Sequence, residues 1–250
     1  GVLVTSASLR DHVTDEATNS WANADIRVGA GHIKAEIHRA AHPSPFDYEG
    51  QTQIYVIGDV SRNSVDEVSA AYRELFLAAG GGGLGLFTAI HRLRAVYERI
   101  SPSLEAANLP LLAQHVEAMD TGTLIDIFRS EENTCLLGTD AVRDGVDVPG
   151  RSLRLIAFDR VPWPRPTILH RARKNAFGGR AYDEMLTRLK LKQAYGRLLR
   201  RQGDRGVFVM LDRALPSRLL SAFPPSVNVR RLGLAETLFQ IRSFLSKQEF

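Results

Sequence analysis

Short apolar runs separated by helical patterns constrain the fold of this chain more than any other feature. Most of the runs consist of β-branched residues or Leu without polar alternation, as expected for strands buried on both faces. They cover residues 2–5, 54–57, 84–87, 134–137, 153–158 and 207–211. Apolar residues at helical spacing mark residues 65–79, 89–100, 121–129, 182–201 and 234–244. Strands that alternate with helices predict an α/β fold, in which helices cover both faces of a parallel sheet.

The composition is that of an ordinary globular protein. Of the 250 residues, 44% are hydrophobic and 24% are charged, which argues against disorder and collagen-like repeats. Cys135 is the single cysteine, so this chain alone cannot form an internal disulfide or a cysteine-ligated zinc or iron–sulfur centre. No apolar run reaches the ~18 residues of a membrane helix, and the first residues lack the order of a signal peptide. We therefore expect a reducing, cytoplasmic location and no membrane partner.

The predicted elements indicate one main domain. Residues 51–250 contain nearly all of the alternating strands and helices, and we interpret them as a single α/β domain. Residues 1–50 form a lead-in that ends in a Pro-rich connector.

Basic residues are concentrated in one segment. Between Arg165 and Arg205 the sequence has twelve Lys or Arg residues against three acidic ones, whereas the remainder has twenty basic and twenty-five acidic residues. A basic segment on a slightly acidic body indicates a polyanionic partner such as nucleic acid or nucleotide phosphate. A solvated basic helix face is an equally open interpretation.

The sequence lacks the motifs with which one chain holds a nucleoside triphosphate. No G-x-x-x-x-G-K-[ST] loop follows a strand. The four glycines at residues 80–83 precede an apolar run, and no Lys follows them, so we interpret them as a connector between a helix and a strand. The seven histidines show no metal-ligand spacing, and we predict no metal site.

A cluster of long polar side chains is the strongest functional signal. If residues 182–201 are helical, Arg197 and Arg200 lie within about 40° of Gln193 around the axis, away from the apolar face. Two guanidinium groups on one face repel each other unless an anion lies between them, and their planar shape matches phosphate oxygens. The pattern indicates arginine fingers, which stabilise charge during phosphoryl transfer. An exposed helix with an incidental basic stripe is the alternative.

A polar segment directly follows the apolar run at residues 134–137. It contains Thr139, Asp144, Gly145 and Asp147. Polar groups at the carboxyl ends of parallel strands lie where α/β sheets bind ligands, and Gly145 permits a close backbone approach or a positive φ. A turn-rich connector with acidic caps is the open alternative.

Together these two segments resemble motifs V and VI of superfamily-two helicases. The rest of the chain resembles the DinG-type branch, which is similar to the XPD helicases. The further matching segments, in chain order, are residues 2–9 (motif III), 44–48, 84–88 (motif IV), 160–166, 204–206 and 211–213. Each segment alone is a weak signal, but their order along the chain is that of the family.

The resemblance implies a RecA-like parallel sheet and a role as the second, C-terminal motor domain of an ATP-dependent DNA helicase. In this family motif VI supplies the arginine fingers, which correspond to Arg197 and Arg200, and Gln193 would also face the nucleotide. The motif V residues that would line the nucleotide side of the cleft are Asp144, Gly145 and Asp147.

The resemblance assigns other residues to DNA and to coupling. Thr88 and Thr139 would contact the DNA backbone. The motif III residues Thr5, Ser6 and Ser8 would couple ATP hydrolysis to movement of the strand.

The resemblance also implies a partner domain that precedes this chain. That N-terminal motor domain would hold ATP and Mg²⁺, and in this branch it usually carries an iron–sulfur cluster. We expect ATP to bind between the two domains and hydrolysis to move them along single-stranded DNA, through backbone contacts that depend on salt. This chain alone is then expected to have no ATPase activity.

Three departures from the family pattern leave an alternative open. Ser8 replaces the usual Thr, Ala89 and Ile90 replace Ser-Tyr, and Arg143 and Asp144 replace Trp-Glu. The last two favour a non-catalytic nucleic-acid-binding module that kept the RecA-like fold, whereas the intact arginine set favours the motor. A stand-alone small-molecule enzyme has little support, because the sequence shows neither a nucleophile–base pair nor a cofactor loop.

Overall fold

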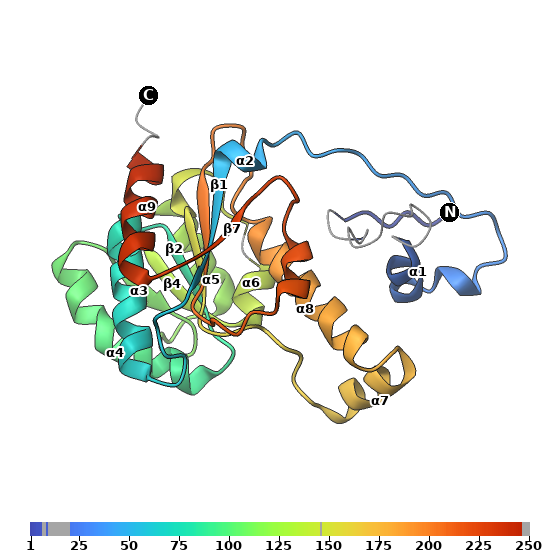
Figure 1. The fold of residues 1–250 in the computed structure, drawn as a ribbon, viewed down its shortest axis with the longest axis horizontal. Helices are drawn as coiled ribbons and strands as arrows, with labels where there is room; N and C mark the ends of the chain where they lie inside the picture. The colour runs from blue at the N-terminus through green and yellow to red at the C-terminus, as the bar shows by residue number, and fades with distance from the viewer. Residues whose placement is uncertain (7–8, 10–20, 146, 247–250) are drawn as a thin grey trace. The chain divides into compact units, whose positions relative to one another are not determined.

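The chain divides into two units, Gly1–Pro45 and Phe46–Phe250. This computed structural model describes residues 1–6, 9, 21–145 and 147–246 (Figure 1). The division falls after Pro45, whereas the sequence places it after residue 50. Helix α2 (Tyr48–Gln51) belongs to the second unit and leads directly into strand β1 (Thr52–Ile57). Asp47 caps α2 by accepting the Gly50 N–H at 3.1 Å.

The described helical residues of the first unit form α1 (Ala22–Val28) and the 3-10 turn η2 (Ala30–His32). The run at residues 2–5, which the sequence predicts as a strand, forms none, and Val2 and Leu3 are 91% and 87% exposed. The prediction is wrong because an apolar run becomes a strand only where another strand pairs with it. None of the described strands pairs with this run.

The described strands of the second unit form one parallel sheet. They are β1, β2 (Gly83–Leu86), β3 (Leu111–Ala113), β4 (Cys135–Gly138), β5 (Leu155–Phe158), β6 (Gly206–Met210) and β7 (Val229–Leu232). Their order is β3-β4-β2-β5-β6-β1-β7, and each neighbouring pair is parallel. All amino ends therefore meet at one edge of the sheet and all carboxyl ends at the other.

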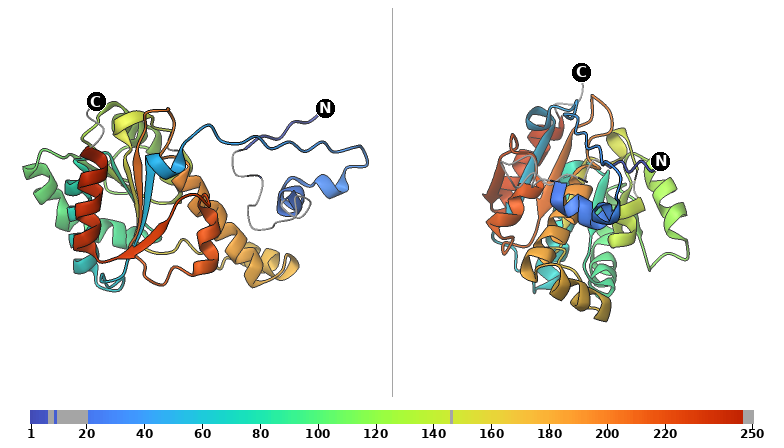
Figure 2. Two further views of the ribbon diagram at one scale, coloured as in Figure 1. Left: turned by 45° about the horizontal axis from the view of Figure 1, so that its top comes forward. Right: turned by 90° about the vertical axis from the view of Figure 1, so that its right-hand side faces the viewer.

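Helices cover both faces of this sheet (Figure 1, Figure 2). The longer ones are α3 (Val65–Ala79), α4 (Ile90–Ala106), α5 (Thr121–Ser130), α6 (Asp140–Gly145), α7 (Ile168–Ala176), α8 (Arg180–Tyr195) and α9 (Leu234–Ser246). Buried residues of α3, α4 and α9 form the core on one face. Those of α5, α6, α8 and the 3-10 helix η4 (Ser217–Ala222) form the core on the other. The predicted α/β class is confirmed.

Strand β1 shows why the apolar runs lack polar alternation. Ile54 and Val56 point into the core under α8, whereas Tyr55 and Ile57 point into the core under α3 and α9. In β2, Gly85 is needed because an added Cβ would lie 2.8 Å from Cε1 of Tyr72. The glycine therefore lets the Tyr72 ring of α3 approach the strand closely.

Several elements escape the sequence analysis, among them β3, β7 and α7. Strand β3 has only three residues, and β7 contains Arg230 and Arg231. Helix α7 has no buried residue and therefore no apolar period. Each lies at the margin of the unit, where burial does not impose a hydrophobic pattern.

Helix α8 ends earlier than predicted. The sequence pattern extends to residue 201, but the helix ends at Tyr195 with Gly196 as its C-cap. The carboxylate of Asp204 accepts the backbone N–H groups of Arg200 and Arg201, each at 2.7 Å. These bonds stabilise a turn where the apolar spacing alone favours a further helical turn.

Candidate functional site

Residues 196–204, which make up nearly all of the segment between α8 and β6, carry three arginines and are called here the arginine loop. Because it immediately precedes β6, it lies at the amino edge of the sheet. Leu198 and Leu199 anchor it in the core at 1% and 4% exposure. The side chain of Gln51 donates to the carbonyls of Gln202 and Asp204, at 2.7 and 2.9 Å. The loop is thus fixed by apolar burial and by hydrogen bonds to the entry of β1.

Helix α6 connects the carboxyl end of β4 to residues near the arginine loop. Within it, Arg143 is 5% exposed and pairs with Asp140 at 2.6 Å and Asp144 at 2.8 Å. Lys190 of α8 also reaches Asp140, at 3.0 Å. The buried guanidinium therefore holds both carboxylates of α6, and Asp140 links this helix to α8.

The structure brings the two predicted nucleotide segments together. Nη2 of Arg197 donates to the backbone carbonyl of Asp144 at 2.9 Å. Nε of Arg200 lies 3.0 Å from Oδ1 of Asp147. Some fifty residues separate each arginine from its partner in the sequence, so the convergence is a property of the tertiary structure. The prediction that Arg197 and Arg200 share a helix face with Gln193 is wrong, because both arginines lie beyond the end of α8.

The contacts of these arginines are weak enough to be exchanged. The side chains of Arg200 and Asp147 are 34% and 69% exposed, and ion pairs so exposed contribute about 0–1 kcal/mol. Partial burial and the nearby Arg200 both lower the pKa of Arg197. A phosphate group between the two guanidiniums would remove their mutual repulsion.

The positions of Gln193 and Gly145 say less about nucleotide binding than those of the two arginines. Gln193 lies near the end of α8, half-buried, and no described residue hydrogen-bonds its side chain. Gly145 does not have a positive φ. An added Cβ there would lie 3.1 Å from Cδ1 of Ile125, so the glycine permits close packing of α6 against α5.

The two threonines expected to contact DNA lie at the carboxyl edge, after β2 and β4. The hydroxyl of Thr88 donates to Oδ1 of Asp159 at 3.4 Å. The hydroxyl of Thr139 donates to Oε1 of Gln114 at 2.8 Å, and Thr139 is 8% exposed. Both hydroxyl protons are therefore used inside the domain. The backbone N–H groups of Thr88 and Thr139 are bound to the same side chains, at 3.1 and 3.0 Å, so any phosphate contact falls mainly to neighbouring cations.

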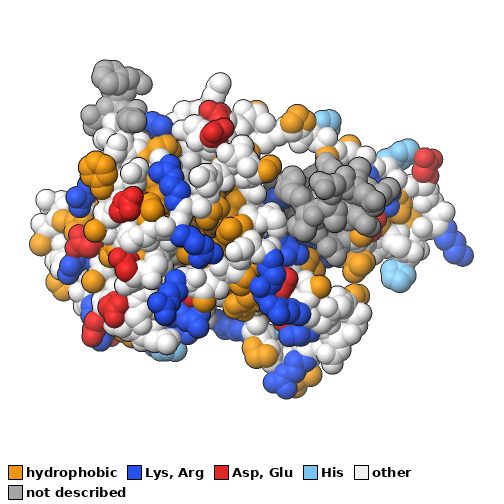
Figure 3. Space-filling view, viewed as in Figure 1, with side chains coloured by type: hydrophobic (Ala, Val, Ile, Leu, Met, Phe, Trp, Pro, Cys, Tyr) orange, Lys and Arg blue, Asp and Glu red, His pale blue; other side chains and the backbone are white. Residues whose placement is uncertain are grey.

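Arg62, Arg92, Arg160 and Arg165 also lie near the carboxyl edge, and sequence analysis did not single them out. We call them the carboxyl-edge arginines. Arg62 pairs with Asp212 at 3.0 Å, and Arg165 donates to the Thr88 carbonyl at 3.3 Å. Figure 3 shows Lys and Arg side chains gathered over the middle and lower part of the visible face. The sequence signal that could have identified these arginines is that basic residues follow shortly after the predicted strands.

Asp159 organises this edge from the interior. Its carboxylate is fully buried and lies 2.8 Å from Nε of Arg92. Burial raises the pKa of Asp159, and the hydrogen bond from Arg92 opposes that rise. The same carboxylate accepts the backbone N–H of Thr88 at 3.1 Å. The loop after β2 is thus tied to β5 by one carboxylate.

The remaining predicted residues lie elsewhere. Thr5 and Ser6 belong to the first unit and are exposed, and Ser8 lies outside the described residues. In the described part of the chain, no three His, Cys, Asp or Glu side chains form a group that could hold a metal ion. None of the described helices is long and apolar enough to cross a bilayer.

The chain is similar to known helicase sequences and structures. Residues 72–228 match the family described as helicase C-terminal domain. An ATP-dependent helicase DinG of Mycobacterium tuberculosis is 36% identical over 204 residues, covering 78% of this chain and 28% of the relative. The ATP-dependent DNA helicase YoaA of Escherichia coli is 31% identical, covering 80% and 33%. A solved XPD helicase superposes with a TM-score of 0.55 at 20% identity, over 73% of this chain and 36% of that one.

The parallel sheet and the ordered segments around it define a RecA-like helicase motor domain. More particularly, the chain belongs to the helicase C-terminal domain family and is of the DinG type. The resemblance drawn from the sequence is confirmed. The chain spans about a third or less of the length of these two relatives.

Proposed function

We propose that this chain is the second motor domain of an ATP-dependent DNA helicase. It supplies Arg197 and Arg200 to ATP held by an N-terminal motor domain. The observation that carries the proposal is the convergence of the arginine loop with the end of α6, where Arg197 meets Asp144 and Arg200 meets Asp147. The names of the DinG and YoaA relatives support ATP and DNA as substrates of the whole protein.

The chemistry assigned to the arginines follows from charge. Phosphoryl transfer spreads negative charge over the transferred oxygens, and a guanidinium placed against them stabilises the transition state. On ATP binding, Arg200 would exchange the exposed carboxylate of Asp147 for a phosphate. The backbone carbonyl of Asp144 holds Arg197 extended without neutralising it. Gln193 and Gly145 complete the nucleotide side of this surface.

Helix α6 connects the carboxyl edge of the sheet with the region of the arginine loop at the amino edge. Thr139 precedes α6 at the carboxyl edge, whereas Asp144 and Asp147 follow near the arginine loop. We assign single-stranded DNA to the carboxyl edge, through Arg62, Arg160 and Arg165 beside Thr88 and Thr139, largely by contact with phosphates. Arg92 is buried against Asp159 and supports this edge from inside. The ion pairs of Arg143 with Asp140 and Asp144 make α6 rigid, so a movement of one end of this helix also moves its other end.

Parts of the activity belong to residues outside this surface. Mg²⁺ would be held mainly by the N-terminal motor domain, since the described residues offer no acidic cluster for it. Cys135 is buried and is the single cysteine, so this chain does not fit an iron–sulfur cluster. Thr5, Ser6 and Ser8 keep their proposed role in coupling hydrolysis to movement.

The decisive experiment substitutes the fingers in the full-length protein. Arg197→Ala and Arg200→Ala are expected to lower kcat for DNA-stimulated ATP hydrolysis by about 10³-fold. Nucleotide affinity should stay within about tenfold, because the loss falls on the transition state. Arg73→Ala is the control, since Arg73 has a comparable exposed ion pair with Glu74, at 2.9 Å, on α3. An unchanged kcat in the finger variants refutes the assignment.

A second measurement addresses the DNA side. Binding of single-stranded DNA should weaken steeply as salt rises, because each neutralised phosphate releases a counterion. Arg160→Ala and Arg165→Ala should each reduce the slope of log affinity against log salt by about one. A flat salt response contradicts the electrostatic interface.

A non-catalytic nucleic-acid-binding module is the second candidate. Arg143, which replaces the usual Trp, favours it. The discriminating result is salt-dependent DNA binding by a full-length protein that has no ATPase activity even without any substitution. The isolated chain is expected to be inactive on either proposal, so ATP turnover by it would contradict the half-site arrangement.

A further inference from the structure

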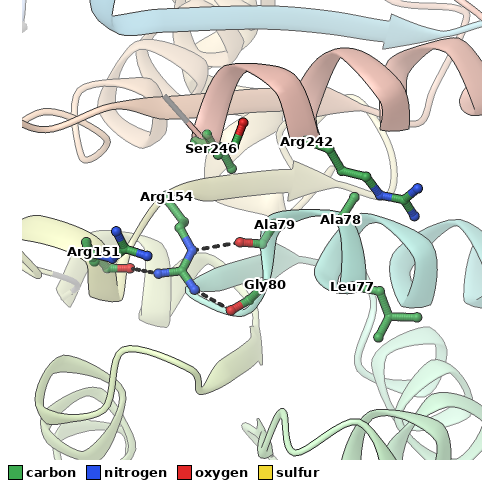
Figure 4. A pocket seen from close by; sticks show the side chains of 9 residues that line it. Leu77, Ala78, Ala79, Gly80, Arg151, Arg154, Arg242 and Ser246 are labelled. Carbon is green, nitrogen blue, oxygen red and sulfur yellow. Dashed lines mark hydrogen bonds between the residues drawn. The ribbon is translucent and has the colours of Figure 1, made fainter. Parts of the chain in front are cut away.

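A cavity of about 280 Å³ lies between the ends of α3 and α9, at the amino edge of the sheet (Figure 4). Leu77 and Ala78 of α3 and Leu245 of α9 give it an apolar wall. Its charged lining consists of Arg151, Arg154 and Arg242, without any acidic side chain. Helices α3 and α9 cover the face opposite α6 and α8. Arg151 follows Gly150, where an added Cβ would lie 3.9 Å from Nη1 of Arg201 in the arginine loop.

Arg154 gives this cavity a buried positive charge. It is 4% exposed, and its nitrogens donate to the carbonyls of Ala79 and Arg151, each at 2.8 Å, and to that of Gly80. No described carboxylate pairs with it. Burial, and then the charge of Arg151, lower the pKa of Arg154. The partial negative charges at the end of α3 offset only part of its charge.

The other two arginines are available to a ligand. Arg151 lies 3.5 Å from Glu132, and their side chains are 46% and 61% exposed. That pair is weak. Arg242 is exposed, and within residues 1–6, 9, 21–145 and 147–246 its guanidinium has no hydrogen-bond or ion-pair partner. In Figure 4 its guanidinium extends away from those of Arg151 and Arg154.

The glycine connector gives the cavity a rigid base. The N–H groups of Gly80, Gly81 and Gly82 donate to Leu77, Phe76 and Thr134 at 3.0–3.2 Å, so they are not free to cradle a phosphate. All three glycines have positive φ, and an added Cβ at Gly81 would lie 2.4 Å from the Asn133 carbonyl oxygen. Any anion here must therefore be bound by the guanidinium groups.

We propose that this cavity binds the phosphate group of a phosphate monoester with a small apolar body. The phosphate would lie beside Arg151 and Arg154, and the exposed side chain of Arg242 would turn toward it; planar guanidiniums suit phosphate oxygens. The apolar wall would cover the rest of the ligand. The cavity is at the small end of the range for ligand sites, which favours a compact molecule. The phosphate group could be presented by a free metabolite or by the end of a nucleic-acid strand.

The test uses phenyl phosphate, inorganic phosphate and a 5′-phosphorylated oligothymidylate as probes, titrated calorimetrically into the 250-residue chain. Phenyl phosphate should bind saturably at one site and more tightly than inorganic phosphate. Arg242→Ala and Arg151→Ala should each weaken it by at least about tenfold. Arg99→Ala is the matched control, because Arg99 has a similarly exposed pair with Asp66, at 2.8 Å. Arg242 has no described partner, so its loss leaves the fold intact.

Each outcome decides the proposal. Competition between the oligothymidylate and phenyl phosphate at this site identifies a strand end as the phosphate source, and its absence identifies a small metabolite. Absence of saturable binding overturns the proposal. Equal weakening by Arg99→Ala, or loss of binding in Arg197→Ala but not in Arg242→Ala, overturns it as well. Loss of binding in Arg197→Ala alone would place the phosphate at the arginine fingers, whereas the other results leave the finger assignment unchanged.

Discussion

Asp204 gives the sharpest prediction about how the arginine loop is held. A single oxygen, Oδ2, accepts the N–H groups of both Arg200 and Arg201 at 2.7 Å, and Asp204 is 4% exposed. Hydrogen bonds to a charged group contribute about 1.5–3 kcal/mol each. Both arginines are exposed, so water can replace part of the loss. We therefore expect Asp204→Ala to lower the free energy of unfolding by about 3 kcal/mol, the low end of the sum.

Asp204→Asn separates the hydrogen bonds from the charge. Because one oxygen accepts both N–H groups, the amide oxygen of Asn can keep both bonds and loses only the charge assistance. The expected cost is about 1 kcal/mol. Urea denaturation of the 250-residue chain, followed by circular dichroism, measures both values. At a slope of about 1–3 kcal/mol per M, the Ala variant should shift the midpoint by about 1–3 M.

Two results would refute this reasoning. One is an Asp204→Ala variant within about 0.5 kcal/mol of the unsubstituted chain, the range of ordinary surface substitutions. The other is an Asn variant as unstable as the Ala variant, which would show that charge rather than the shared acceptor fixes the loop. In the full-length protein, Asp204→Ala should also lower ATPase kcat, because Arg197 and Arg200 lose their fixed positions.

Three further predictions concern buried and paired groups. Burial raises the pKa of the Cys135 thiol to about 12, so the folded chain should not react with a thiol reagent at pH 8, and rapid labelling without denaturant would contradict this. Asp159→Asn leaves the guanidinium of Arg92 buried without its carboxylate and should cost about 3–5 kcal/mol in urea denaturation; a loss below 1 kcal/mol would contradict the pairing. Burial opposes ionisation of Asp183, but hydrogen bonds led by that of Lys174 outweigh it and lower its pKa. The contribution of ionised Asp183 to the free energy of unfolding is therefore complete above about pH 4 and is lost as pH falls through the lower pKa of the folded state. The difference in free energy of unfolding between the unsubstituted chain and Asp183→Asn should shrink at pH 3.

The sequence by itself determined the class of fold and the order of its segments. Strands β1, β2, β4, β5 and β6 were predicted because burial on both faces leaves a continuous apolar run. Helix α3 was predicted with its bounds from the spacing of its apolar residues. In the structure Ser64 caps its start and Gly80, with a φ of 67°, ends it. These signals are local, so they can be found without knowing what lies across the sheet.

The tertiary structure alone decided how the candidate site is assembled. The meetings of Arg197 with Asp144 and of Arg200 with Asp147 depend on packing between α6 and α8, which no local period encodes. The end of α8 was misplaced because the carboxylate of Asp204, several residues downstream, captures N–H groups that an α-helix would otherwise use. The cavity beside Arg154 likewise exists only where the ends of two distant helices meet. Hydrophobic periodicity indicates which residues are buried, whereas the partners of Arg197, Arg200 and Asp159 are long-range contacts.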